Sequence, residues 1–129
     1  MRAAVATAAG IFVIDLETEE LLDVDADPPT GAAVHVELPL VVAAAASGST
    51  VVAIVDRRPP LAVSHDAGRT WHEAGGGLPL GVAVAIDEDN PDRILYAARN
   101  RLYVSEDGGR FWRALAPELP AIKTVGFLP

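Results

Sequence analysis

The chain has 129 residues and a formal net charge of −8, and half of its residues are hydrophobic. This length fits a single domain, and the apolar content excludes wholesale disorder. The acidic balance, 18 Asp and Glu against 10 Lys and Arg, argues against nucleic acid as a partner. The absence of Cys excludes disulfides, thiolate metal sites and cysteine nucleophiles.

An apolar run follows Arg2 and covers residues 3–14. It contains β-branched residues and a glycine, and it enters an acidic stretch at Asp15 without the small-residue cleavage site of a signal peptide. No segment reaches the roughly 18 apolar residues that a membrane helix needs. We therefore expect two strands here, at residues 2–7 and 10–14, no contact with a membrane, and a cytoplasmic location.

A long irregular link, residues 25–37, follows the first strands and contains His35. Its Glu37 lies two residues further on, so in an extended segment the two side chains point to the same side. A metal ion would need more ligands than this pair, and no cluster of His, Asp or Glu has the spacing of metal ligands. We expect no metal site and no cofactor.

The second unit, residues 38–75, opens with the small-residue run 41–46, which we expect to be an inner strand beside a crowded axis. Arg57 and Arg58 stand in the link between its second and third strands, next to two prolines that stiffen that link. The unit ends in the segment LAVSHDAGRTW, residues 61–71.

The third unit, residues 79–116, repeats that segment as LYVSEDGGRFW at an offset of 41 residues. Its turn residues separate four short apolar segments, at 82–86, 93–98, 102–104 and 111–115. A period near 40 residues with four short strands per unit is typical of a propeller blade.

The two ends of the chain match different strands of one unit. Residues 122–127 correspond to a first strand and residues 2–7 to a second strand. We therefore predict an all-β, circularly permuted chain, in which residues 1–129 form one half-ring of three four-stranded blades. Blade 1 comprises residues 2–30 with the C-terminal strand 121–128, blade 2 residues 38–75, and blade 3 residues 79–116.

Three blades are fewer than the four to eight that propellers typically have. A three-blade wedge would expose two apolar sheet faces. We expect two copies to close a six-bladed ring as a C2 homodimer, with the C-terminal strand of each chain completing a blade of the other. A trimer with nine blades and a monomeric fragment are the alternatives, and a natural or an engineered origin suits the regular spacing equally.

A compact turn follows the third strand of blades 2 and 3. Its Ser and Asp can bond nearby backbone N–H groups, its Gly permits a positive φ, and its Trp covers the turn. The residues are Ser64, Asp66, Gly68 and Trp71 in blade 2, and Ser105, Asp107, Gly109 and Trp112 in blade 3.

This pattern resembles the Asp-box, or BNR repeat, of propeller blades in sialidases, sortilin-type receptors, some glycoside hydrolases and photosystem assembly factors. The resemblance implies a structural turn that lies away from the ligand face, so we expect no catalytic role for Asp66 or Asp107. A sialidase would also need an arginine triad and a tyrosine nucleophile. Tyr96 and Tyr103 lie inside predicted strands, so we do not expect that activity.

Arginines gather in the links that a propeller places on one face, whereas acidic loops fall on the other face. Arg57, Arg58, Arg99 and Arg101, with His35, are candidate ligands for an anion at the mouth of the ring. The alternative is that these arginines pair with Asp56, Asp25 or Glu37, or are simply solvated.

The sequence favours a non-enzymatic scaffold or binding module for an anionic small molecule or a protein segment. The alternative is a carbohydrate-binding or degenerate glycosidase-like protein, related to sialidases. Asp27 and Glu37 would be its only plausible carboxylate pair on the arginine-rich face. The aromatic content of 5% counts against a sugar site.

Overall fold

A computed structural model describes residues 1–29 and 34–129. Within these residues the secondary structure consists of twelve strands. They are β1 (Arg2–Thr7), β2 (Gly10–Asp15), β3 (Leu21–Leu22), β4 (Val41–Ser47), β5 (Thr50–Val55), β6 (Leu61–Ser64), β7 (His72–Ala74), β8 (Ala83–Ile86), β9 (Ile94–Ala97), β10 (Leu102–Ser105), β11 (Arg113–Ala114) and β12 (Ile122–Phe127). The predicted end of blade 1 at residue 30 and the middle of the long link lie outside the described residues.

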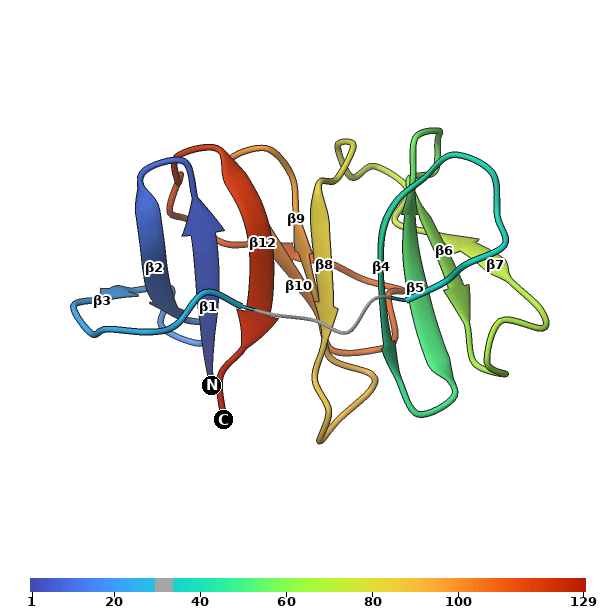
Figure 1. The fold of residues 1–129 in the computed structure, drawn as a ribbon, viewed down its shortest axis with the longest axis horizontal. Helices are drawn as coiled ribbons and strands as arrows, with labels where there is room; N and C mark the ends of the chain where they lie inside the picture. The colour runs from blue at the N-terminus through green and yellow to red at the C-terminus, as the bar shows by residue number, and fades with distance from the viewer. Residues whose placement is uncertain (30–33) are drawn as a thin grey trace.

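The strands form three antiparallel four-stranded sheets within the described part of the chain (Figure 1). Blade 1 has the order β12-β1-β2-β3, blade 2 the order β4-β5-β6-β7, and blade 3 the order β8-β9-β10-β11. The predicted all-β fold with three four-stranded blades is confirmed. Among the described residues no helix is long and apolar enough to cross a membrane.

Blade 1 is assembled from both ends of the chain. β12 pairs with β1 of the same chain, and Ala4 lies opposite Gly126 and Val5 opposite Val125. The N–H of Leu128 also donates to the carbonyl of Arg2, so the two termini lie side by side (Figure 1). A single chain thus completes this blade without a strand from a second copy.

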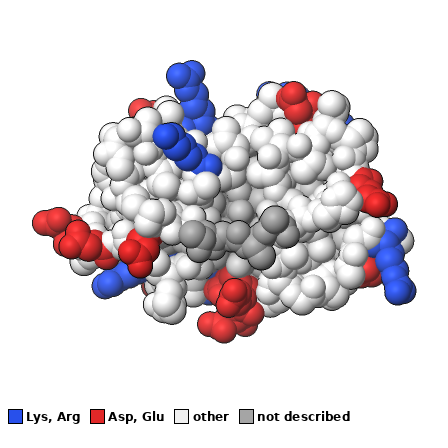
Figure 2. All heavy atoms as spheres, viewed as in Figure 1, with Lys and Arg blue, Asp and Glu red and all other residues white. Residues whose placement is uncertain are grey.

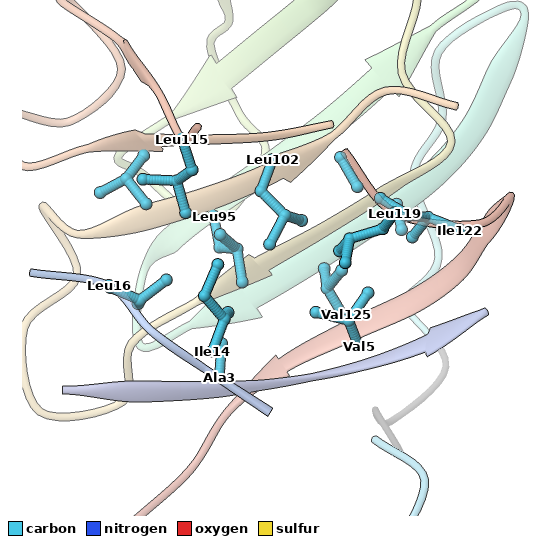
Figure 3. Packing of buried hydrophobic residues seen from close by; sticks show 13 residues of the cluster. Ala3, Val5, Ile14, Leu16, Leu95, Leu102, Leu115, Leu119, Ile122 and Val125 are labelled. Carbon is cyan, nitrogen blue, oxygen red and sulfur yellow. The ribbon is translucent and has the colours of Figure 1, made fainter. Parts of the chain in front are cut away.

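Blade 3 lies between the other two blades. One core cluster joins blades 1 and 3, where Ala3, Val5 and Ile14 pack with Leu95 and Leu102 (Figure 3). A second cluster joins blades 2 and 3 and includes Val52, Ile54, Ile94 and Tyr96. The spatial order is therefore blade 2, blade 3, blade 1 (Figure 1).

The fourth strand of blade 3 is shorter than the predicted residues 111–115, because β11 covers only Arg113–Ala114. In the preceding turn, residues 111 and 112 form hydrogen bonds within the turn. The N–H of Phe111 donates to Asp107, and the indole N–H of Trp112 donates to the carbonyl of Gly109. The turn therefore ends only where the pairing with β10 begins.

Tyr96 fixes the contact between the core and the link that leads into blade 3. Its side chain is fully buried, and its ring packs edge-on against Tyr103 and Trp112. Its hydroxyl donates to the carbonyl of Pro79, and burial raises the pKa of Tyr96 to about 12. A Cβ added at Gly81 would lie 2.4 Å from Cζ of this ring.

We expect Gly81→Ala to lower the free energy of unfolding by about 1–3 kcal/mol, because the ring of Tyr96 has no room to move in a packed core. Gly76→Ala is the matched control, since a Cβ there meets nothing within 4 Å. Urea denaturation of both variants measures the difference. Equal stability of the two variants would contradict this account of the packing.

Candidate functional site

The turn at residues 64–71 is closed by a network of hydrogen bonds. The Ser64 hydroxyl donates to Asp66 Oδ1 at 2.8 Å and accepts the N–H of Gly68 at 2.8 Å. Asp66 accepts the Thr70 N–H at 2.8 Å and the Thr70 hydroxyl at 2.6 Å. The indole N–H of Trp71 donates to the carbonyl of Gly68 at 3.1 Å. Gly68 has a φ of 88°, which an L side chain rarely adopts.

The turn at residues 105–112 has the same construction. Ser105 donates to Asp107 at 2.8 Å and accepts the Gly109 N–H at 2.9 Å. Asp107 accepts the N–H of Phe111 at 3.0 Å. Phe111 stands where blade 2 has a threonine, so this carboxylate receives no hydroxyl there. The Phe111 ring is instead 79% exposed.

The carboxylates of both turns are held in their charged form by the donors around them. The hydroxyl of Thr70, then its N–H and the hydroxyl of Ser64, lower the pKa of Asp66 to about 2. The N–H of Phe111 and the hydroxyl of Ser105 likewise lower the pKa of Asp107. Both groups thus act as fixed acceptors within their own turns.

A third aspartate turn lies in blade 1, whose sequence lacks the serine and the glycine of the motif. Asp15 accepts the N–H groups of Glu17 at 2.9 Å and Thr18 at 3.0 Å, and these bonds lower its pKa. The signal available in the sequence was an aspartate at the end of a strand with a threonine three residues later. Comparison with the two clearer copies obscured it, because the serine and the glycine of the motif are missing here.

Three of the four predicted arginines have acceptors other than those expected. Arg57 lies 3.3 Å from Glu73, and Arg101 lies 2.9 Å from Glu118. Arg58 donates to the carbonyl of Leu78 at 3.2 Å. For these three guanidinium groups the contacts among the described residues are with these acceptors and not with Asp56, Asp25 or Glu37, which were the alternative partners. Glu73 and Glu118 stand 16 and 17 residues along the chain from their partners, and only the folded sheet brings them close.

Arg99 lies beside a second cation. Its carbonyl accepts the N–H of Ile122 at 2.8 Å, which places Lys123 next to it along the backbone. Figure 2 shows Lys and Arg side chains rising from the upper edge of the molecule and acidic side chains gathering at the lower edge below β8. The structure thus brings Arg99, Arg101 and Lys123 to one end of blades 3 and 1, and leaves Arg57 and Arg58 on blade 2.

His35 lies away from the core. Its Nε2 is 3.7 Å from Glu37 Oε1, and both side chains are exposed on the link. Among residues 1–29 and 34–129, no group of three His, Asp or Glu could hold a metal ion.

Two arginines that the sequence did not single out join different parts of the fold. Arg93 contacts Asp87 at 3.1 Å and Glu106 at 3.0 Å. Arg113 of blade 3 contacts Glu19 at 3.0 Å and donates to the carbonyl of Leu16, both in blade 1. Arg113 therefore links the outer part of blade 3 to the outer part of blade 1.

A cleft of about 460 Å³ lies between the inner strands β4, β8 and β12. The small side chains Ala44–Ala46 form one wall, and Val84 and Val125 belong to the other strands. Asp87, Glu88 and Asp89 line its acidic side. The run of alanines thus lines the axial side of the wedge.

The three sheets define a protein built from propeller-type blades. No family model and no curated protein matches the chain. Among solved structures it is similar to a GH74 enzyme from Niastella koreensis, with a TM-score of 0.51 and 26% identity. The similarity covers 60% of this chain and 12% of that enzyme, so the chain corresponds to a small part of it.

The turn carboxylates predict an acid-sensitive contribution to stability. Because the pKa of Asp66 is about 2 in the folded chain and 3.8 ordinarily, its contribution is complete above about pH 4 and is lost as the pH falls toward 2. Asp66→Asn should remove this part of the pH dependence and flatten the unfolding curve between those limits. Urea denaturation at several pH values measures it.

Asp23→Asn, at an exposed aspartate of the link, is the control for the loss of one negative charge. If both variants kept the same pH dependence as the wild type, the carboxylate of Asp66 would not carry the effect.

Proposed function

We propose that the chain is a non-enzymatic binding module of Asp-box type. The observation that carries this proposal is that the motif carboxylates are consumed by their own turns. Asp66 and Asp107 accept hydrogen bonds from within four residues, and these bonds lower the pKa of both groups, so neither is suited to donate a proton. Tyr96 is buried and hydrogen-bonded in the core, where a nucleophile would be out of reach of a substrate. Binding is then the work of the links and faces rather than of these motif residues.

We further propose that two copies form a six-bladed ring. Each chain supplies three blades, and the spatial order leaves one face of blade 1 and one face of blade 2 without a neighbouring blade. Val42 of β4 remains 52% exposed, whereas every residue of β9 in the central blade is fully buried. A second wedge would give blades 1 and 2 the neighbours that blade 3 already has.

Light scattering behind a sizing column tests the ring directly. We expect a mass of twice 13.5 kDa at high concentration. A monomer at every concentration would contradict the ring, and a mass of three chains would indicate nine blades instead.

The ligand class that the arginine-rich end favours is an anion. Arg99, Arg101 and Lys123 lie at the end of the strands opposite the 105–112 turn, and only Glu118 offsets their charge by a contact among the described residues. A C2 ring would repeat the cluster on the same face. Guanidinium groups hold carboxylates and phosphates through paired N–H donors, and like charges around one mouth raise the local potential.

We expect Arg99→Gln to weaken binding of inositol hexakisphosphate, used as a polyanionic probe, by roughly tenfold in calorimetry. Arg110→Gln is the control, since it removes the same charge from the turn at the other end of β10. Equal losses in the two variants would indicate general charge attraction and contradict a site at Arg99.

Carbohydrate binding is the second candidate, and the similarity to a GH74 enzyme favours it. Glu37 and Asp27 would be the carboxylates involved, both exposed on the link. Binding on a glycan array that is lost in Asp27→Asn and kept in Arg99→Gln would favour this candidate over the anion-binding module.

A further inference from the structure

Several residues on the outer faces of the end blades are buried although no blade lies against them. In blade 1, Ala4 and Val13 alternate with residues that pack on blade 3, so they point away from it. In blade 2, Ala53 and Val55 alternate with Val52 and Ile54, which pack on blade 3, so Ala53 and Val55 also point away from blade 3. All four are at most 1% exposed. Another part of the same chain therefore covers these faces.

The cover is the link between β3 and β4, here called the strap and described for residues 23–29 and 34–40. On blade 1, residues 25–29 line a groove together with Ala4 and Gly126. Pro29 packs so closely on β12 that a Cβ added at Gly126 would lie 2.9 Å from Pro29 Cβ. Figure 1 shows the strap passing in front of the strands of blade 1.

The strap continues over blade 2 with an alternating pattern. Val34, Val36 and Leu38 are half-buried, whereas His35 and Glu37 between them are exposed. Val34 lines the axial cleft together with Ala44–Ala46, and the carbonyl of Leu40 accepts the N–H of Asp56 at 2.9 Å. The strap thus lies on blade 2 as an extended segment with its apolar side inward.

The length of the strap matches this role. It spans eighteen residues between β3 and β4, whereas the links that join neighbouring blades, residues 75–82 and 115–121, have eight and seven. A step between adjacent blades needs only the shorter length. The additional length is what allows the described residues 25–29 to lie on blade 1 and residues 34–40 to lie on blade 2.

We propose that the strap stands in for the missing neighbouring blade and competes with a second copy of the chain for the outer faces of blades 1 and 2. This inference rests on the six-bladed ring proposed above. A second copy fits these faces because Ala4, Val13, Ala53 and Val55 are apolar, as are the residues through which blade 3 packs on blades 1 and 2. Figure 2 shows charged side chains over blade 2 only at the edges of the molecule on this side, which suits an apolar blade rather than a charged ligand there.

A reversible lock tests the competition. The chain has no cysteine, so Pro29→Cys with Gly126→Cys introduces one disulfide that ties the strap to β12. We expect the oxidised double variant to remain monomeric at concentrations where the wild type dimerises, and the reduced form to dimerise again. The two single cysteine variants, treated with the same oxidant, are the controls.

A second variant works in the opposite direction. Val34→Ser removes an apolar contact of the strap and leaves both blade faces unchanged, so we expect the dimer dissociation constant to fall by about tenfold. If the oxidised lock dimerised like the wild type, the competition would be refuted and the ring would stand. If the wild type and Val34→Ser were both monomeric throughout, the ring would be refuted and the competition with it.

Discussion

The structure depends on covering both faces of each four-stranded sheet. An apolar sheet face left in water forfeits about 25 cal/mol for each Å² of apolar surface. Blade 3 meets this requirement with its two neighbours, and all four residues of β9 are fully buried as a result. Blades 1 and 2 each have a blade on one side only. The position of the described strap residues on the outer faces follows from this difference between blade 3 and the two end blades.

The aspartate turns serve the same requirement at the outer ends of the strands. A Cβ at Gly109 would contact Val63 and Ala74 of blade 2, so the turn of blade 3 lies against the neighbouring sheet. The Trp112 ring from this turn packs on Tyr96 with the ring centroids 5.7 Å apart. On the other side, Arg113 reaches Glu19 and the carbonyl of Leu16 in blade 1. The motif that stands out in the sequence therefore stabilises the contact between blades. Its polar groups form hydrogen bonds with one another, and its tryptophan packs at the boundary between the blades.

The repeats made the blades predictable, and the ends of the chain made the composition of blade 1 predictable, because strand identity follows from a fixed period. The arginine partners were not predictable in this way. Glu73 lies in β7, which pairing with β6 brings next to Arg57. Glu118 lies in the link after β11, which the bond from the N–H of Leu119 to the carbonyl of Asn100 brings next to Arg101. The strap was missed for a related reason. It has no counterpart in the other units, so a comparison of repeats treats it as an irregular link and says nothing of the faces on which it lies.

In the proposed competition, the length of the strap affects how strongly it holds the outer faces against a second copy. Doubling a flexible link costs only about 0.6 kcal/mol in closure entropy, whereas burying one valine or leucine side chain contributes about 1.5–3 kcal/mol. Val34, Val36 and Leu38, even half-buried, can therefore offset the cost of a strap that is twice as long as its counterparts. Because the strap is tethered, it acts at an effective concentration in the millimolar range. In the proposed ring a second copy would have to exceed this advantage, so we expect the closed single chain in dilute protein and the ring only in concentrated protein.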